Sequence, residues 1–293
     1  MRFFSSNPTT VSPSGTPYVL RQEAVSLRNV KSYAGISSSR LELLEERMKS
    51  DVLAELKAFD GRLLLHSETD GGAVNPVWEV VEDESSIKTL REIMDDAARR
   101  MAIDATYRRI PITAEKSPDF SDVREIVEIV AQLDVDRSAI IVNCQLGRGR
   151  STRAQVLITL VQRWIKAAGH RLPTTARDSP RSTRLSYTVI NNLLRTIRSG
   201  QEVKNAVDDA ITACSEPYDL LDSIEKARQS AEDAKLQGDM EQVKVRTERG
   251  VQNLRCVRLL RQAQYHLTSL NRAEHTTSSS CAFRSRLLPR SWL

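Results

Sequence analysis

The chain contains a short apolar run that ends in a cysteine and leads into glycines and arginines: Ala139-Ile140-Ile141-Val142-Asn143-Cys144-Gln145-Leu146-Gly147-Arg148-Gly149-Arg150-Ser151-Thr152. The β-branched residues before Cys144 are typical of a buried strand. After Thr152, apolar residues recur at the spacing of one helix face: Leu157, Leu160, Val161, Trp164 and Ile165. The stretch therefore predicts a strand, a glycine-rich loop and an amphipathic helix in direct succession.

This order of parts suits a cysteine that attacks a phosphate monoester. The nucleophile in such chemistry is a thiolate, and an ordinary cysteine is mostly protonated at neutral pH. We expect Cys144 to face the start of the next helix, with Arg148, Arg150 and Arg153 nearby. Positive charge at that position lowers the pKa of a thiol. The stretch thus predicts a reactive thiol, and the alternative is a structural thiol buried at a strand end.

The residues after the cysteine can form a cradle for phosphate. Gly147 and Gly149 permit the positive φ angles with which successive backbone N–H groups surround an anion. Arg150 can bind two phosphate oxygens with its planar guanidinium, and Ser151 can place a hydroxyl beside the sulfur. The predicted phosphate-binding residues are Gln145, Leu146, Gly147, Arg148, Gly149 and Arg150. No G-x-x-x-x-G-K-[ST] phosphate loop occurs, which excludes a Walker-type nucleotide site.

Composition narrows the class of protein. The 293 residues are 40% hydrophobic and 28% charged, with a net charge of +5, which describes a globular protein that suits an anionic ligand. The four cysteines, at 144, 214, 256 and 281, lack the paired spacing of a disulfide framework or a zinc site. We therefore expect free thiols in a reducing, cytoplasmic setting, with no metal and no cofactor. No apolar run is long enough to span a membrane, and we expect no nucleic-acid partner.

Strands and helices alternate along the first two thirds of the chain, which predicts an α/β fold. Expected helices follow caps at Ser37–Ser39 and at Ser85–Ser86, and another covers residues 121–132. Expected strands cover residues 62–66, 77–81, 106–112 and 138–143. Trp78 and Trp164 lie within apolar patterns and are expected in the core.

Composition also suggests domain boundaries. Residues 1–16 are rich in Ser, Thr and Pro and are predicted to be disordered, as is the Ser- and Arg-rich tail, 271–293. Residues 17–200 form the predicted catalytic-type domain. Residues 201–270 form a predicted helical connector, in which Gly238 separates two helices. The apolar stripes of these helices pack either on the domain's own core or on a partner.

The stretch around Cys144 matches the C-x5-R-[ST] loop of protein tyrosine phosphatases. Its form, C-Q-x-G-R-G-R-[ST]-T, resembles paladin-like proteins, which are built from repeated modules similar to cysteine phytases. Further segments carry the resemblance over about residues 17–265: Pro17–Arg21, Leu27–Tyr33, Arg40–Glu42, Arg109–Pro118 and Ile190–Leu194. The resemblance implies a protein tyrosine phosphatase-like sheet flanked by helices, with a helical C-terminal extension. It also implies that the connector contacts a further module that this chain lacks.

The resemblance further implies roles for single residues. Cys144 is the expected nucleophile, Arg150 the phosphate ligand, and Ser151 the group that helps the thiolate leave. The general-acid Asp of the T-D-H-x-x-P loop in cysteine phytases aligns with Ala114 in Thr113–Pro118, and the histidine that often precedes the cysteine is Asn143 here. Loss of a general acid typically lowers a rate by about 10²–10⁴-fold.

Glu115 stands one position beyond the vacated acid and is the candidate substitute, with a solvated loop carboxylate as the alternative, while Asp119 is a poorer candidate. The sequence therefore predicts a phosphate monoester hydrolase that acts through a phosphocysteine on phosphotyrosine-type protein or phosphorylated inositol. The alternative is a pseudophosphatase that binds phosphorylated ligands without turnover. A third reading is a fragment too short to fold independently.

Overall fold

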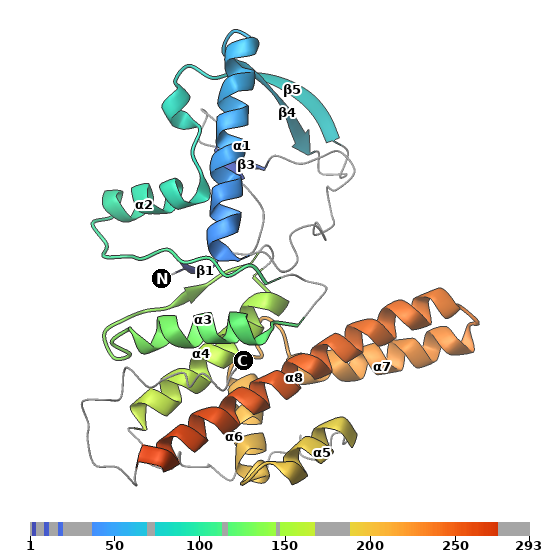
Figure 1. The fold of residues 1–293 in the computed structure, drawn as a ribbon. Coiled ribbons are helices and arrows are strands. Elements are labelled where there is room, and N and C mark those ends of the chain that lie inside the picture. The colour runs from blue at the N-terminus through green and yellow to red at the C-terminus, as the bar shows by residue number, and fades with distance from the viewer. Residues whose placement is uncertain are drawn as a thin grey trace. The chain divides into compact units, whose positions relative to one another are not determined.

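The computed structural model describes residues 2–3, 9–11, 17–19, 37–68, 74–112, 117–144, 147–167 and 188–274 (Figure 1). The chain divides into two compact units, residues 1–113 and residues 114–293, and each is described by itself. Three short strands open the first unit: β1 (Arg2–Phe3), β2 (Thr9–Val11) and β3 (Pro17–Val19). β2 pairs antiparallel with β3 although it lies within the segment predicted to be disordered. The boundaries predicted at residues 16, 200 and 270 remain predictions.

Helix α1 (Ser38–Ala58) and a β-hairpin form the core of the first unit. Ser37 caps α1 as predicted, because its side chain accepts a hydrogen bond from the N–H of Arg40. The hairpin joins β4 (Arg62–Glu68) to β5 (Val74–Val80), with Leu63 opposite Glu79. The apolar residues that α1, the hairpin and the following turn bury together are Val52, Leu56, Leu63, Leu65, Val81 and Ile87.

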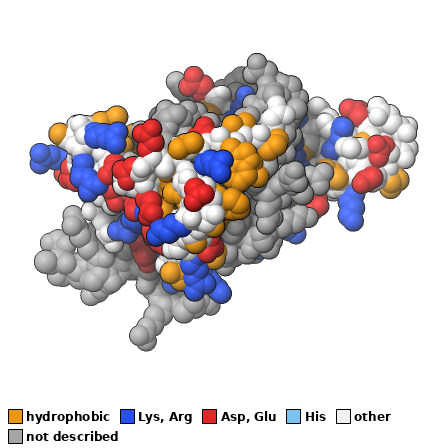
Figure 2. Space-filling model, turned by 90° about the horizontal axis from the view of Figure 1, so that it is seen from above, with side chains coloured by type: hydrophobic (Ala, Val, Ile, Leu, Met, Phe, Trp, Pro, Cys, Tyr) orange, Lys and Arg blue, Asp and Glu red, His pale blue; other side chains and the backbone are white. Residues whose placement is uncertain are grey.

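Trp78 lies outside the core, so its predicted burial is wrong. Its side chain is 51% exposed and contacts the ring of Phe59, with the ring centroids 5.5 Å apart. Strand residues alternate between faces, and the pairing of Trp78 with Leu64 places both on the face opposite Leu63. Exposed hydrophobic side chains are visible from above in Figure 2, and those of the hairpin and the end of α1 are Phe59, Leu64, Val77, Trp78 and Val80.

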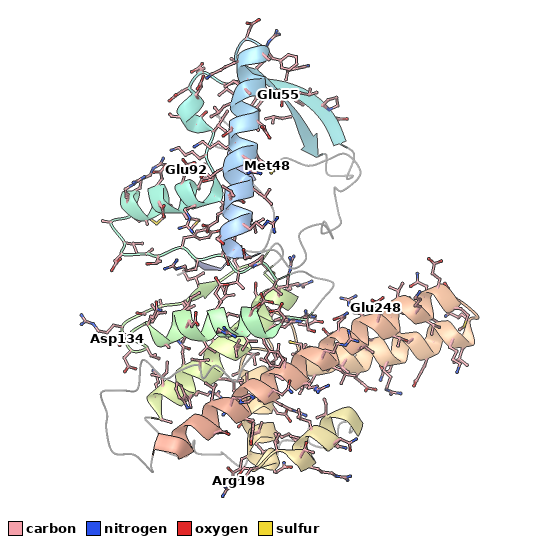
Figure 3. The ribbon with its side chains drawn as sticks, viewed as in Figure 1. Met48, Glu55, Glu92, Asp134, Arg198 and Glu248 are labelled. Carbon is pink, nitrogen blue, oxygen red and sulfur yellow. The ribbon has the colours of Figure 1, made fainter. Side chains whose placement is uncertain are left out.

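The next helix begins later than the sequence predicts. Ser85 and Ser86 lie in a short 3₁₀ turn, Glu84–Ser86, capped by Asp83, and do not cap the helix. Thr89 caps α2 (Leu90–Arg100) in a reciprocal arrangement with Glu92. The carboxylate of Glu92 also forms an ion pair with the ammonium of Lys49, at 2.7 Å. This pair connects α2 to α1 beside Met48 (Figure 3).

The strand predicted at residues 106–112 does not form. Among these residues only Tyr107 makes a β-bridge. Pro111 has no N–H to donate, and the N–H of Ile112 turns back to the carbonyl of Ile110 at 2.9 Å, so a regular ladder cannot continue. The segment is instead held by Arg109, whose buried guanidinium pairs with the buried carboxylate of Glu45 on α1.

Loss of the buried ion pair between Arg109 and Glu45 should lower the stability of the chain strongly. Burial raises the pKa of Glu45 although the charge and hydrogen bond of Arg109 act in the opposite direction. Arg109→Leu leaves Glu45 buried without its cation, so we expect the free energy of unfolding to fall by about 3–5 kcal/mol in urea denaturation. Arg108→Leu, at an exposed neighbouring position, is the control and should change stability little. Equal losses in the two variants would contradict the role of the pair.

In the second unit, several other helices pack around one central helix, which follows the cysteine loop. α3 (Phe120–Ala131) precedes the short strand β6 (Ile141–Val142), which covers only part of the predicted strand 138–143. α4 (Gly149–Lys166) follows the cysteine loop and packs against α3, α6 and α8. The remaining helices are α5 (Thr188–Thr196), α6 (Gly200–Ala213), α7 (Leu220–Leu236) and α8 (Met240–Glu274). Trp164 is buried on α4, as predicted.

α7 and α8 form an antiparallel helical hairpin (Figure 1). Gly238 separates them as predicted, at a φ of +76° that glycine adopts without strain. Leu220, Ile224, Ala227 and Ala234 of α7 are buried. In the part of the chain that the structure describes, no helix is both long and apolar enough to cross a membrane.

Candidate active site

Cys144 lies two residues after β6 and is 6% exposed. Its carbonyl accepts a hydrogen bond from the N–H of Gly147 at 3.4 Å, which turns the chain immediately after the cysteine. The strand therefore delivers Cys144 to the loop that leads into α4, in the order that the sequence predicts.

Gly147 gives the loop its shape. Its φ is +66°, in the region that disfavours a side chain, and a Cβ built there would lie 3.6 Å from Oδ1 of Asn143. Gly149 does not share this role, contrary to the prediction, because it already belongs to the first turn of α4 and its φ is not positive. A Cβ on Gly149 would have no neighbour within 4 Å.

The start of α4 has the features of an anion-binding helix end. The N-cap residue, Arg148, provides no side-chain cap, and the first intrahelical bond runs from the N–H of Thr152 to the carbonyl of Arg148 at 2.9 Å. Arg150 and Ser151 belong to this first turn, whereas the sequence places the helix after them. A helix N-terminus without a side-chain cap attracts negative charge through its N–H groups and its dipole.

Two hydroxyl groups in the first turns of α4 are buried, and the described part of the chain offers neither of them a hydrogen-bond partner. Ser151 is 6% exposed and Thr152 is 3% exposed. The groups concerned are Ser151 Oγ and Thr152 Oγ1. A buried hydroxyl without a partner is costly. The predicted role of Ser151, to place its hydroxyl beside the cysteine sulfur and help the thiolate leave, stays a prediction.

Arg153 does not join the arginines of the loop. Its guanidinium is buried and donates from Nη2 to Oδ1 of Asn253 on α8, at 2.6 Å. It also lies near Cys256, whose thiol pKa is raised to about 11 by burial although the charge of Arg153 acts against that rise. Arg148 is exposed and Arg150 is half-buried, so these two remain as the cations of the loop.

The predicted acid, Glu115, lies outside the described residues, as do Ala114, Gln145 and Leu146. Asp119 is described and caps α3. Partial burial acts to raise its pKa, but hydrogen bonds from the Ser121 hydroxyl and from the N–H groups of Ser121 and Asp122 lower it overall. Because its carboxyl is ionised at neutral pH, Asp119 is a poor proton donor, in agreement with the sequence.

Asp122 is the second residue of this capping box, and its pKa is shifted in the opposite direction to that of Asp119. Its carboxylate accepts the N–H of Asp119 at 2.9 Å, yet burial raises its pKa to about 6, and the nearby carboxylates of Asp119 and Glu125 add to the rise. The carboxyl thus keeps its proton in the folded state at a pH where the unfolded chain has released it.

A pH-dependent stability follows from Asp122. Between about pH 4 and pH 6 the folded chain binds more protons at this site than the unfolded chain, so its contribution to stability falls as pH rises. Asp122→Asn removes this effect and keeps an acceptor for the cap, so the melting temperature of the variant should rise relative to wild type from pH 4 to pH 7. Glu128→Gln, at an exposed position on the same helix, is the control. A constant difference in melting temperature across this range would contradict the shift.

Two contacts near the site were not foreseen from the sequence. Oε1 of Gln252 on α8 accepts the N–H of Ser117 at 3.2 Å, and Asn253 binds Arg153 as described above. Both come from the predicted connector. The sequence does show two side-chain amides, Gln252 and Asn253, beside the apolar positions of α8. It does not indicate which residues these amides contact.

Comparison with known proteins shows the family of this chain. The family model for PTP-like phytases, described as "Inositol hexakisphosphate", matches residues 9–162, which is more than half of the chain. The cysteine loop lies within the matched region. The chain belongs to the PTP-like phytase family.

Curated relatives include paladins. Paladin of Danio rerio is 28% identical over 136 residues, which is 43% of this chain and 16% of the relative. Paladin of Homo sapiens is 25% identical over 199 residues, which is 63% of this chain and 22% of the relative. The chain is thus a paladin-like module, and the alignments span less than a quarter of these two relatives.

Solved structures show the same fold. The tandemly repeated protein tyrosine phosphatase-like phytase from Mitsuokella multacida superposes with a TM-score of 0.53 and 14% identity, over 98% of this chain and 36% of that chain. A PTP-like myo-inositol phosphatase from Mitsuokella multacida, in complex with myo-inositol-(1,3,4,5)-tetrakisphosphate, gives a TM-score of 0.50 and 16% identity, over the same shares. The fold is therefore the predicted α/β phosphatase-like fold with a helical C-terminal part.

The difference between the two loop glycines is testable. Gly147→Ala places a side chain at a strained positive φ and should weaken binding of inorganic phosphate several-fold, measured by isothermal titration calorimetry. Gly149→Ala, in open space within a helix, should bind phosphate within about twofold of wild type and melt no lower. Equal phosphate affinity in the two variants would contradict the role given to Gly147.

Proposed function

We propose that this chain is a cysteine-dependent phosphate monoester hydrolase. The observation that carries the proposal is the arrangement after β6: a cysteine, a turn at positive φ, and a helix start that lacks a side-chain cap and buries an unpartnered hydroxyl. These are the parts that hold a phosphate beside a sulfur nucleophile.

The reaction has two steps. The thiolate of Cys144 attacks phosphorus, the bond to the leaving oxygen breaks, and the Glu115 carboxyl donates a proton to that oxygen. Water then attacks the phosphocysteine, the S–P bond breaks, inorganic phosphate leaves, and the Glu115 carboxylate takes the proton of the water. Arg150 and the loop N–H groups bind the phosphate oxygens throughout, and Ser151 stabilises the thiolate as it leaves.

Phosphorylated inositol is the substrate class that the comparisons favour. The matching family carries the name of inositol hexakisphosphate, and a solved relative holds a myo-inositol tetrakisphosphate. Several phosphates on one ring also suit a chain of net charge +5. A phosphotyrosine-type protein is the second substrate class, since the C-x5-R-[ST] loop is common to phosphatases of both kinds.

A pseudophosphatase is the second candidate function. Ala114 occupies the position of the general acid, and Asn143 replaces the histidine that often precedes the cysteine. Neither change removes the phosphate cradle. This function therefore predicts phosphate or inositol phosphate binding that is lost in Arg150→Ala, without turnover.

An aryl phosphate separates the two functions, because its leaving group needs a general acid least. We expect the chain to release phosphate from p-nitrophenyl phosphate, and Cys144→Ser to abolish at least about 99% of that release. Cys214→Ser, a half-buried cysteine whose sulfur lies 3.7 Å from Thr159 Oγ1, is the control and should retain activity. Equal release by wild type and Cys144→Ser would refute the hydrolase, and phosphate binding without release would establish the pseudophosphatase.

A further inference from the structure

Two adjacent amide residues of α8 contact both parts of the chain that flank the proposed site. Asn253 is 1% exposed, and its Oδ1 accepts the hydrogen bond from Arg153, three residues after Arg150 on α4. The preceding residue, Gln252, accepts the backbone N–H of Ser117, which directly follows the segment that carries Glu115. All four residues belong to the second unit. Figure 3 labels Glu248, one turn before Gln252 on α8.

The hydrogen bonds of Asn253 fix its orientation. Its Nδ2 donates to Ser223 Oγ at 2.9 Å and to Tyr218 Oη at 3.2 Å, so that its Oδ1 is directed at Arg153. The amide is thus bound on both sides, by Ser223 of α7 and by Tyr218, two residues before α7, on one side and by Arg153 of α4 on the other. A buried amide with all of these bonds made holds its partners rigidly, since breaking any of them leaves a buried polar group unsatisfied.

Arg153 connects this network to the phosphate cradle. Its buried guanidinium has a neutral amide, and no carboxylate, among the partners that the described residues provide. A buried cation without other compensation depends strongly on the hydrogen bond that it has. Arg153 lies three residues after Arg150 on α4, so this bond joins α8 to the turn that follows the cysteine loop.

We propose that Gln252 and Asn253 are positioning residues for the cysteine-loop site. Asn253 fixes the first turns of α4 through Arg153, and Gln252 fixes the backbone at Ser117, beside the segment that carries the acid. This proposal rests on the proposed function for its catalytic consequence. Through Gln252 and Asn253, α8 then has a positioning role at the site in addition to that of a connector.

The kinetic test uses the full chain and two substrates. Gln252→Leu should lower kcat for an alkyl phosphate, which needs the acid, about fivefold to tenfold, while kcat for p-nitrophenyl phosphate changes less than twofold and KM is unchanged. Gln252→Glu keeps an acceptor for the Ser117 N–H and should restore the alkyl rate. Gln242→Leu, at an exposed position on the same helix, should leave both rates unchanged. Equal losses on the two substrates, or no loss, would overturn the role of Gln252.

A binding measurement tests the role of Asn253 without any need for turnover. Asn253→Leu should weaken binding of inorganic phosphate about tenfold in calorimetry, whereas Gln252→Leu should not weaken it. Where Asn253→Leu does not fold, Arg153→Lys keeps the charge without the planar fork and should give the same loss. Wild-type affinity in a folded Asn253→Leu or Arg153→Lys variant would overturn the role of Asn253. If wild type binds phosphate but turns over neither substrate, the hydrolase fails while this test still decides the role of Asn253.

Discussion

The burial of α4 is the constraint on which the site depends. Val156, Ile158, Leu160 and Val161 are each 0% exposed, and at about 100° per residue these four positions span about 200° of the helix circumference. More than half of α4 is therefore covered, and α3, α6 and α8 pack against it. The polar residues of its first turns consequently have little room to move. A phosphate cradle at the start of such a helix is preorganised, which is what stabilisation of charge by fixed dipoles requires.

Binding and turnover rest on different parts of this chain. The proposed phosphate cradle depends on Gly147, on the start of α4 and on its buried hydroxyls. Turnover also needs a proton for the leaving oxygen, and the family's acid position holds Ala114. Asp119 cannot supply that proton at neutral pH because its hydrogen bonds favour the ionised form. The chemistry therefore depends on Glu115, or on substrates whose leaving groups need no acid.

Sequence reasoning succeeded where the signal is local. The cap at Ser37, the break at Gly238 and the strand-loop-helix order around Cys144 each depend on residues close together in the chain. It failed where tertiary contacts decide. The buried pairing of Arg109 with Glu45 holds residues 106–112 in place of a strand, and no periodicity shows that contact. Pro111, by contrast, was a local signal against the strand that the prediction did not use.

The same limit applies to the site. Two glycines in the loop predicted two positive φ angles, but α4 begins early enough to include Gly149. Three arginines near Cys144 in sequence predicted three cations near it in space. Helical periodicity separates Arg153 from Arg150 by about 300°, so the two side chains of α4 differ in direction by about 60°. Which neighbour each side chain meets then depends on α8, whose Asn253 lies 100 residues further along the chain.

The position of Arg153 also bears on how the thiolate is stabilised. The Arg153 guanidinium hydrogen bonds to α8, and its charge acts on the thiol of Cys256. Among the described residues of the loop and the helix that follows it, the start of α4, Arg148 and Arg150 remain as sources of positive potential. In the proposed complex the bound phosphate would neutralise Arg150. With Asn143 in place of histidine, the reactivity of Cys144 depends on the helix start more than it would in a relative with the histidine, and so on whatever holds α4 in place.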